Sequence, residues 1–576
     1  MTRRFLPFSI LFTATSLFAQ IAVDSVDSTA VAVSTDTTGK VAPDLVSSAS
    51  KATATASLSG SKTTPSIDVF VQFVKGFNGS AASKVPAGGT LKQSFGKLGA
   101  LYSVPVSSIP TMAADSQVRY LSPNRKLKGA LDYSESAVGA DIAFNSGLTG
   151  AGVGIAVIDS GIAPVNDLKQ NGASRIVYSE NFVAGSTTTN DLWGHGTHVA
   201  GIAAGNAAQS TGAGYTRTFR GAAPGAQIVN LRVLDQNGSG DDASVVQAIQ
   251  RAIDLKATYN IRVINLSLGR AVMDTYANDP LCQAVQAAWD AGIVVVAAAG
   301  NAGRNNTYNT NGYGTIHSPG NSPYVITVGA MRTNGTAVRS DDLIATYSSK
   351  GPSAVDRIVK PDIVAPGNKV ASLLSANSTM LGQYPENRVP LSYYTSGSGY
   401  SNDYFKLSGT SMATPVVSGA VALMLQQDPT LTPDDVKVRL MRTATKNFPQ
   451  YSTWVDPVTN QSFTSQYDIF TIGAGYLDVM AALANTGRAG TTPARSPSVA
   501  ANGSTVTVQY PAGSAWTTST WAPQLVWGSA VINASNQAWG TGVVWSSGTQ
   551  GFNVVWGDNV VWGDNVVWGD NVVWGE

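Results

Sequence analysis

The chain has 576 residues, 43% of them hydrophobic, which is enough for about four domains of roughly 150 residues and for a sizeable core. Its 37 Lys and Arg residues balance 36 Asp and Glu residues, and the net charge of +1 argues against nucleic acid as a partner. The single cysteine, Cys282, excludes an intramolecular disulfide, and three histidines without a CxxC motif leave little material for a structural zinc site. We therefore expect packing to stabilise the fold, and calcium is a second candidate source of stability.

Residues 1–22 have the pattern of a bacterial-type signal peptide. Arg3 and Arg4 precede an apolar stretch from Phe5 to Phe18, and small residues follow. A buried N-terminal helix is the alternative, but the basic start and the abrupt polar run afterwards favour export. We expect the protein to be secreted and extracellular.

Two different segments follow. Residues 23–66 are rich in Ser, Thr, Ala, Val and Asp, without aromatic residues or a sustained apolar period, which predicts a flexible linker. Regularity returns over residues 67–128, where IDVFVQFV alternates like a strand and LYSVPV and VRYLSP predict two more short strands. Helix-length polar stretches separate them, so we expect a small α+β domain there.

Residues 133–485 alternate apolar strand-like runs with helix-like segments. The predicted strands are continuously apolar and bounded by Gly, Pro, Asn or Asp, as in strands buried on both faces of a parallel sheet. They are GVGIAVID, AQIVNLRVL, IRVINLSLG, AGIVVVAAAGN and YVITVGA, with helical spacing in SVVQAIQRAIDLKA and LCQAVQAAWDAG between them. This alternation predicts an α/β domain with a doubly wound sheet.

The tail over residues 500–576 has a different composition. It holds nine of the twelve tryptophans, and from Val554 onward it repeats VVWGDN with a period of six residues. Val-Val-Trp is strand-prone and Gly-Asp-Asn is turn-prone, so a β-rich module is expected.

Asp159 is the first candidate catalytic residue, because it ends the predicted strand GVGIAVID and functional groups cluster beyond such strand ends. A turn-capping role is the alternative. His195 follows in DLWGHGTHVAGIAAG, where Gly194 and Gly196 leave its imidazole unobstructed. His198 would face the same side of that helix, so a paired metal site is a second interpretation, which the lack of further ligands nearby disfavours.

Ser411 lies in KLSGTSMATPVVSGAVALML, where we expect Pro415 in the first turn of an apolar helix. Backbone N–H groups at a helix N-terminus point at any anion formed beside them, although a serine there is commonly just an N-cap. Asn301 ends the run IVVVAAAGN and is either an oxyanion donor or a turn residue. Together, Asp159, His195 and Ser411 occur in one of the three chain orders known for the catalytic triad.

Four segments resemble the signature segments of the subtilisin-like serine proteases, the subtilases or peptidase S8 family: IAVIDSGI, HGTHVAG, AAAGN and GTSMATP. Similar support comes from RGAAPGAQIVNLRVLD, INLSLG, YSSKGPS and KPDIVAPG, so the resemblance covers about residues 148–482. It implies a subtilisin-like α/β catalytic domain over residues 133–485. It also implies a serine endopeptidase that hydrolyses peptide bonds of proteins and needs no cofactor for this chemistry.

By this resemblance Asp159 would orient His195, His195 would be the general base and then the general acid, and Ser411 would be the nucleophile that forms an acyl-enzyme. Asn301 and the Ser411 backbone N–H would donate to the oxyanion. Two segments would flank an extended peptide and pair with its backbone. They are Gly238, Ser239 and Gly240 on one side and Ser267, Leu268 and Gly269 on the other, and each segment alone also fits a simple Gly-containing loop.

Residues 67–128 resemble the inhibitory propeptide of the same family, an I9-like, ferredoxin-like domain. Such a segment would assist folding and occupy the cleft as an intramolecular inhibitor until the enzyme cleaves itself. SQVRYLSPNRKL looks like its last strand and exit, so we expect a maturation cut between about Pro123 and Val138.

Structural calcium is common in this family, but no ligand set can be matched residue by residue here. The acidic pairs Asp241–Asp242 and Asp341–Asp342 are expected to be solvated loop acids.

A competing hypothesis makes the chain a surface-binding or adhesion protein whose Trp-rich tail is the main functional element. Tryptophans stack on sugars and fill interfaces, so the tail could contact the cell envelope, a polysaccharide or a partner. The plainer alternatives are the core of a small β-module and a sorting signal.

Overall fold

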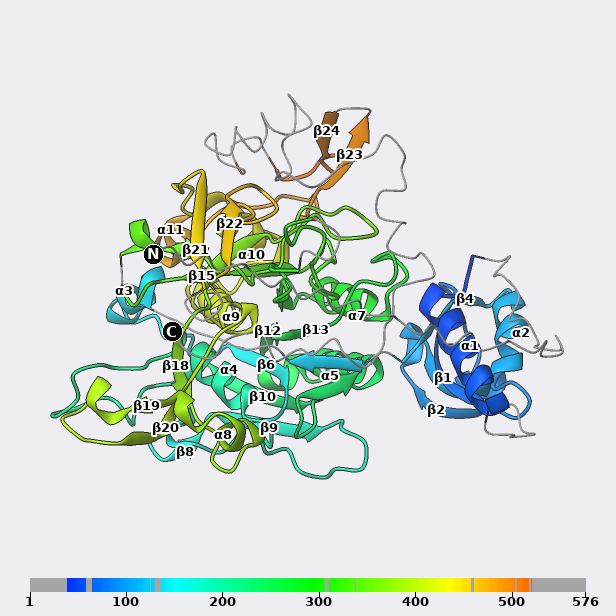
Figure 1. The fold of residues 1–576 in the computed structure, drawn as a ribbon, viewed down its shortest axis with the longest axis horizontal. Coiled ribbons are helices and arrows are strands. Elements are labelled where there is room, and N and C mark those ends of the chain that lie inside the picture. Colours follow the sequence, from blue (N-terminus) through cyan, green and yellow to red (C-terminus); the bar gives the residue numbers. More distant parts are fainter. Residues whose placement is uncertain are drawn as a thin grey trace, which may run out of the picture.

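Figure 1 shows the computed structural model of the chain. The structure describes residues 39–58, 65–124, 126–129, 136–305, 310–336, 338–456, 460–502, 505–516 and 520. The predicted signal peptide and the VVWGDN repeats lie outside the described residues. Within the described ranges, no helix is both long and apolar enough to cross a membrane.

A small N-terminal module lies beside the main domain, at the side that carries α7 (Pro280–Asp290) (Figure 1). Its antiparallel sheet has the strand order β2-β3-β1-β4. The elements are β1 (Ser66–Phe73), β2 (Thr90–Ser94), β3 (Ala100–Pro105), β4 (Val118–Pro123) and the short helix α2 (Ile109–Ala114). The three strands expected in this region are thus confirmed.

A helix, α1 (Pro43–Leu58), occupies part of the segment for which the sequence predicted a flexible linker. It contacts β4 and β1, and the side chains of Leu45 and Ala49 are fully buried against the small module. The two residues are four positions apart and therefore lie on one helical face. The sequence analysis did not predict this helix, because the buried face consists mainly of small residues and these give only a weak apolar periodicity.

The main domain is built on a largely parallel sheet, as predicted. Within the described residues it has eight strands, in the order β16-β15-β14-β12-β6-β10-β9, with β17 also paired to β15. Only β16 runs antiparallel to its neighbour. The strands are β6 (Gly154–Asp159), β9 (Ile176–Asn181), β10 (Gln227–Arg232), β12 (Ile261–Leu266), β14 (Val294–Ala298), β15 (Ile326–Arg332), β16 (Leu343–Ile344) and β17 (Ile363–Pro366).

Helices pack on this sheet in two pairs. Helix α4 (His195–Ala204) contacts α9 (Thr410–Gln427), and both contact strands of the sheet. Helix α5 (Asp242–Asp254) contacts α7, and both again contact the sheet. All six residues of β6 are buried, as expected for a central strand covered on both faces. His195, at the start of α4, contacts Asp159 at the end of β6, and Ser411, near the start of α9, bonds to Ser267 just after β12.

An arm follows β18 (Val370–Leu373) and returns through β19 (Arg388–Pro390) and β20 (Tyr400–Leu407), which form a three-stranded antiparallel sheet. The arm carries the short helix α8 (Thr379–Gln383). Backbone N–H groups of Thr379 and Met380 donate to the carbonyl oxygens of Leu192 and Trp193, at 2.9 and 3.1 Å. The arm thus holds the loop that leads into α4.

Chain beyond residue 485 also packs on the main domain. The Ser496 hydroxyl donates to a carboxylate oxygen of Asp362 at 2.5 Å and accepts from the Lys437 ammonium group at 2.8 Å. Burial lowers the pKa of Lys437 to about 7, against the opposing effect of Asp362. Trp516 is only 7% exposed, and its indole N–H donates to the Arg495 carbonyl. The first residues of the predicted tail are therefore part of the packed structure.

Candidate active site

Asp159 and His195 meet at the carboxyl end of β6. The imidazole Nδ1 lies 2.7 Å from Asp159 Oδ1, and the two side chains are 0% and 1% exposed. His195 is the first residue of α4, and Gly196 follows it. A Cβ on Gly196 would stand 2.2 Å from the Gly161 carbonyl oxygen and 3.2 Å from Asp159 Oδ1, so glycine is needed for this approach.

Asp191, which the sequence analysis did not single out, holds this pair in place. Its buried carboxylate accepts hydrogen bonds from the backbone N–H groups of Gly194 and Thr197 and from the Ser160 hydroxyl, at 2.7, 2.8 and 2.8 Å. Burial raises its pKa, while these hydrogen bonds oppose the shift. Ser160 in turn donates its backbone N–H to Asp159 at 2.7 Å. The only sequence signal was an acidic residue four positions before His195.

Ser411 is fully buried near the start of α9, where Gly409 is the N-cap. Its hydroxyl donates to the Ser267 carbonyl oxygen at 3.0 Å. Pro415 is inside the helix and not in its first turn, so that prediction is wrong. Proline lacks the N–H that would bond to the Ser411 carbonyl four residues earlier. The Ser267 hydroxyl donates to that carbonyl instead, at 2.7 Å.

Asn301 follows the end of β14 and is oriented by Thr410, the residue before Ser411. Its Oδ1 accepts from the Thr410 backbone N–H at 2.9 Å and from the Thr410 hydroxyl at 3.0 Å. The Thr410 Oγ1 also accepts from the Gly300 backbone N–H at 3.1 Å. With the oxygen engaged, the amide nitrogen of Asn301 is left to donate elsewhere. Thr410 is a second positioning residue that no sequence pattern had indicated.

A strand of the chain itself lies between the two predicted substrate-binding segments. Strand β5 (Lys126–Gly129) pairs antiparallel with β11 (Ser239–Asp241) on one side and with β13 (Leu268–Gly269) on the other. The partners are Lys128 with Ser239, Leu127 with Gly240, Lys126 with Asp241, Gly129 with Leu268 and Lys128 with Gly269. Gly238 and Ser267, the other two residues of the predicted set, directly precede these strands.

The part of the chain that carries these predicted site residues matches a family model. The model of the subtilase family matches residues 150–464, which include Asp159, His195, Asn301 and Ser411. The chain belongs to the subtilase family. It is therefore a serine-type endopeptidase that hydrolyses proteins, as the resemblance implied.

Curated relatives of this subtilase are themselves proteases. Serine protease AprX from Bacillus subtilis (strain 168) is 39% identical over 360 residues, which are 60% of this chain and 74% of AprX. Subtilisin DY from Bacillus licheniformis is 36% identical over 315 residues, which are 54% of this chain and 91% of that protein. The thermostable alkaline protease of Halalkalibacterium halodurans is 34% identical over 334 residues, 58% of this chain and 73% of its own.

His198 does not pair with His195 as a metal ligand in this subtilase. Its Nε2 lies 3.1 Å from the carbonyl oxygens of both Val370 and Phe405, so this nitrogen carries the proton and donates to the β18–β20 sheet. Burial, and secondarily His195, lower the pKa of His198 to about 3. The histidine is thus a neutral structural group that ties α4 to the arm sheet.

The acids considered as calcium ligands have protein partners. Asp242 is buried in a bidentate ion pair with Arg270, at 2.9 and 3.0 Å, which corrects the expectation of a solvated loop acid. Asp342 is also buried and accepts from the Tyr476 hydroxyl at 2.6 Å. Among the described residues, no three His, Cys, Asp or Glu side chains are grouped to hold a metal ion.

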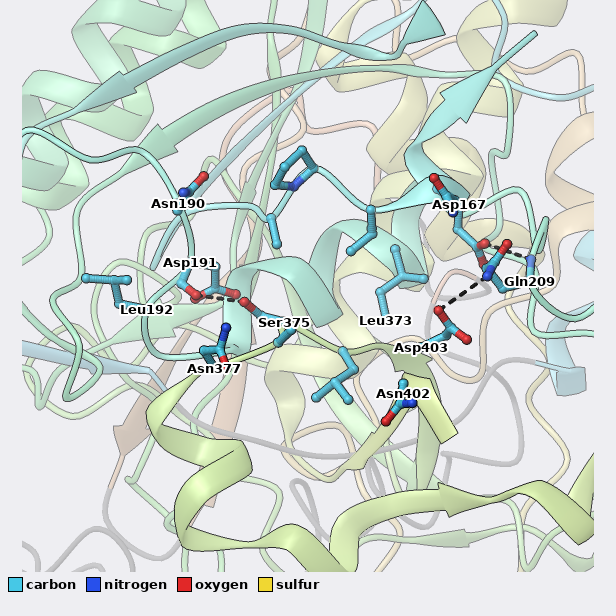
Figure 2. Close-up of a pocket in the computed structure, with 16 residues that line it drawn as sticks. Asp167, Asn190, Asp191, Leu192, Gln209, Leu373, Ser375, Asn377, Asn402 and Asp403 are labelled. Atoms are coloured by element: carbon cyan, nitrogen blue, oxygen red, sulfur yellow. Dashed lines mark hydrogen bonds between the residues drawn. The ribbon is translucent and has the colours of Figure 1, made fainter. Parts of the chain in front are cut away.

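A pocket of about 420 Å³ lies beside the Asp191 loop (Figure 2). Its wall includes Ser375, whose hydroxyl donates to the Asp191 carbonyl oxygen at 2.7 Å. At the other end Gln209 reaches Asp403 at 3.4 Å. The lining does not include Asp159, His195 or Ser411, the three predicted catalytic residues.

Proposed function

We propose that the chain is the precursor of a secreted serine endopeptidase, with an inhibitory propeptide over residues 67–128 and a catalytic domain over residues 133–485. The observation that carries this proposal is the position of β5, paired on both edges by β11 and β13. Strand addition to a sheet edge is a recurring mode of peptide recognition, in which main-chain hydrogen bonds supply the affinity. A module tethered by such a strand blocks the cleft until the connection is cut.

The proposed nucleophile is Ser411, with His195 as its base and Asp159 as the residue that orients the base. With Nδ1 held by Asp159 at 2.7 Å, Nε2 is the imidazole nitrogen that would take the hydroxyl proton. In the described state this hydroxyl donates to Ser267, so it must turn to His195 before attack. The serine oxygen then adds to the peptide carbonyl, and His195 returns the proton to the leaving amine. Water hydrolyses the resulting acyl-enzyme by the same route.

Asn301 and the Ser411 backbone N–H are the proposed donors to the oxyanion. Thr410 holds the Asn301 oxygen, which favours a fixed direction for the amide nitrogen. A donor that is oriented before the reaction stabilises the developing charge without paying for reorganisation. Gly238, Ser239, Gly240, Ser267, Leu268 and Gly269 are the proposed residues of the peptide-binding edges.

The proposed maturation cut follows Ala130, within the expected window. Gly129 is paired with Leu268, so the next position of the peptide would be opposite Ser267. The Ser267 carbonyl accepts the Ser411 hydroxyl, which brings the nucleophile to that position. Cleavage between Ala130 and Leu131 would release the module of residues 67–128 together with the preceding chain.

The test compares the purified precursor with its Ser411→Ala variant, following intact mass and casein hydrolysis in the same samples. We expect the wild type to acquire a new N-terminus at Leu131 and to digest casein, while the variant does neither. Equal behaviour of the two proteins would overturn the role of Ser411. A mature N-terminus within residues 67–120 would overturn the proposed propeptide.

The other roles rest on the N-terminal 22 residues and on the tail beyond residue 520, which lie outside the described residues. Secretion depends on the signal-peptide pattern of residues 1–22, and binding to a cell envelope or polysaccharide depends on the Trp-rich tail. Deleting residues 521–576 tests the latter, because loss of retention on insoluble material with intact peptide hydrolysis would mark the tail as an accessory binder.

A further inference from the structure

The peptide-binding cleft has an aromatic wall next to the catalytic histidine. Trp193 lies two residues before His195 and is half-buried. Its indole packs on Gly238, where atoms of the ring lie 2.6 to 3.1 Å from the position that a Cβ would take. Gly238 also has a positive φ of 69°, so a side chain there would be both strained and in collision with the ring.

The register of β5 brings one peptide residue to this wall. Lys128 pairs with Ser239, the first residue of β11, so Gly129 is the next peptide residue on the side of the turn residue Gly238. On its other edge Gly129 pairs with Leu268. A side chain at the Gly129 position would therefore come close to Gly238, where the Trp193 indole already packs.

The backbone around Trp193 is restrained by hydrogen bonds, so the indole has little room to move away from the peptide. The carbonyl oxygens of Leu192 and Trp193 accept hydrogen bonds from the N–H groups of Thr379 and Met380 of the arm. The next residue, Gly194, donates to Asp191 at 2.7 Å, and a Cβ on it would meet the Ser378 hydroxyl at 2.7 Å. The Trp193 indole N–H is buried and has no hydrogen-bond partner, so packing alone fixes the ring.

We propose that Trp193 is a specificity-determining residue, which restricts the second residue before the cleaved bond to glycine. The inference rests on the proposed function, in which the chain is cut after Ala130 and Gly129 is that second residue. The enzyme's own connecting segment satisfies the restriction, since it carries Lys-Gly-Ala at residues 128–130. The preferred substrates are therefore extended protein segments with glycine at this position.

The test uses the processed enzyme and fluorogenic peptides with the sequence of residues 126–133, Lys-Leu-Lys-Gly-Ala-Leu-Asp-Tyr, in which the Gly129 position is Gly, Ala or Leu. We expect kcat/KM for the glycine peptide to exceed that for the leucine peptide by at least about tenfold, since misplaced methylene groups commonly change selectivity by about 10- to 200-fold. Trp193→Ala should raise hydrolysis of the leucine peptide and lower this ratio by at least about tenfold. Trp193→Phe should retain most of the discrimination.

Trp454→Ala is the matched control, because Trp454 is a half-buried indole on a hairpin, stacked under Arg304 and away from the cleft strands. In this variant the ratio of kcat/KM for the glycine peptide to kcat/KM for the leucine peptide should equal that of the wild type. A second readout lies within the chain: Gly129→Leu should slow self-cleavage of the precursor, and adding Trp193→Ala should restore it.

Each outcome decides the proposal. Equal cleavage of the three peptides by the wild type would overturn it and leave the proposed function standing. An unchanged ratio in Trp193→Ala would also overturn it. If that variant does not fold, the wild-type peptide series and Trp193→Phe still decide, since a flat series refutes the restriction. Failure of the wild type to cut any peptide, with no difference from Ser411→Ala, would instead contradict the proposed function.

Discussion

Ser267 and Ser411 exchange hydrogen bonds between their hydroxyl and carbonyl groups. The Ser267 hydroxyl donates to the Ser411 carbonyl at 2.7 Å, and the Ser411 hydroxyl donates to the Ser267 carbonyl at 3.0 Å. The first bond replaces the one that Pro415 cannot make within α9. Asn265 supports the arrangement by donating to Ser267 Oγ at 2.9 Å. Two hydrogen bonds thus join the proposed nucleophile to the proposed peptide-binding edge.

Replacing Ser267 by alanine should therefore destabilise the start of α9. The buried Ser411 carbonyl would lose its partner, which commonly costs about 1–3 kcal/mol of the free energy of unfolding. The cost is measured by urea unfolding in the Ser411→Ala background, where self-digestion cannot occur and the Ser411 carbonyl is retained. In the active enzyme we expect a lower kcat with little change in KM.

Pro415→Ala provides the control for this explanation. The alanine N–H can bond to the Ser411 carbonyl, so the double variant Ser267→Ala/Pro415→Ala should regain part of the lost stability. A double-mutant cycle with no coupling between the two positions would contradict the role assigned to the Ser267 hydroxyl.

Removing the proposed oxyanion donor should reduce turnover far more than binding. Asn301→Ala is expected to lower kcat by about 100- to 1,000-fold, the loss seen when such a donor is removed from subtilisin. Thr410→Val should give a smaller loss, because the Thr410 backbone N–H still holds Asn301 Oδ1 while the hydroxyl bond is gone. Steady-state kinetics on one peptide substrate measure both effects.

The double variant checks that Thr410 acts through Asn301. Adding Thr410→Val to Asn301→Ala should cause little further loss of kcat. Two fully additive losses would indicate that Thr410 has a separate role.

Contacts of the small module with the main domain should set how long it stays bound after cleavage. Arg119 donates to Gln283 at 3.0 Å and also to the Ala277 carbonyl, next to the start of α7. Arg119→Ala removes charge-assisted hydrogen bonds worth about 1.5–3 kcal/mol, or roughly tenfold or more in affinity. Gel filtration after self-processing should show less of the module eluting with the protease.

Lys92→Ala is the matched control for Arg119→Ala. Lys92 is an exposed cation of the same module that pairs at 2.7 Å with Asp68 of the module itself. Its loss should leave co-elution unchanged, and an equal effect of both variants would contradict a specific contact at Arg119.

Acid should destabilise the folded main domain through His198. Burial lowers its pKa from 6.5 to about 3, so the unfolded chain binds a proton that the folded chain rejects. Stability from this group is complete above pH 6.5 and is lost as the pH falls toward 3. At pH 5 the loss is roughly 2 kcal/mol relative to pH 7, since each pH unit in this window corresponds to about 1.4 kcal/mol.

His198→Gln tests this pH dependence. Its amide N–H can still donate to the Val370 and Phe405 carbonyls, but it does not titrate. Urea unfolding in the Ser411→Ala background should show a shallower fall in stability between pH 7 and pH 5 for the glutamine variant. Parallel profiles for the two proteins would exclude His198 as the source.

The sequence alone identified the family and the residue types of the site. Continuous apolar runs predicted β6, β10, β12, β14 and β15, because a strand buried on both faces tolerates few polar residues. Asp159 and His195 could be paired because each lies in a short motif that resembles those of one family, and the structure brings them within 2.7 Å.

The tertiary structure decided which residues support that site. Asp191 was identified by its hydrogen bond from the Ser160 hydroxyl, Thr410 by its hydrogen bonds to the Asn301 oxygen, and Trp193 by its packing on Gly238. Helix α1 and the interior position of Pro415 were likewise settled only by packing. Asp191 and Ser160 are 31 residues apart in the chain, Thr410 and Asn301 are 109 apart, and Ser267 and Ser411 are 144 apart. The periodicity of apolar residues predicts which face of a helix or strand is buried. The hydrogen-bond partners of a site residue, and the side chains that line a peptide-binding cleft, depend instead on which other element packs against that face.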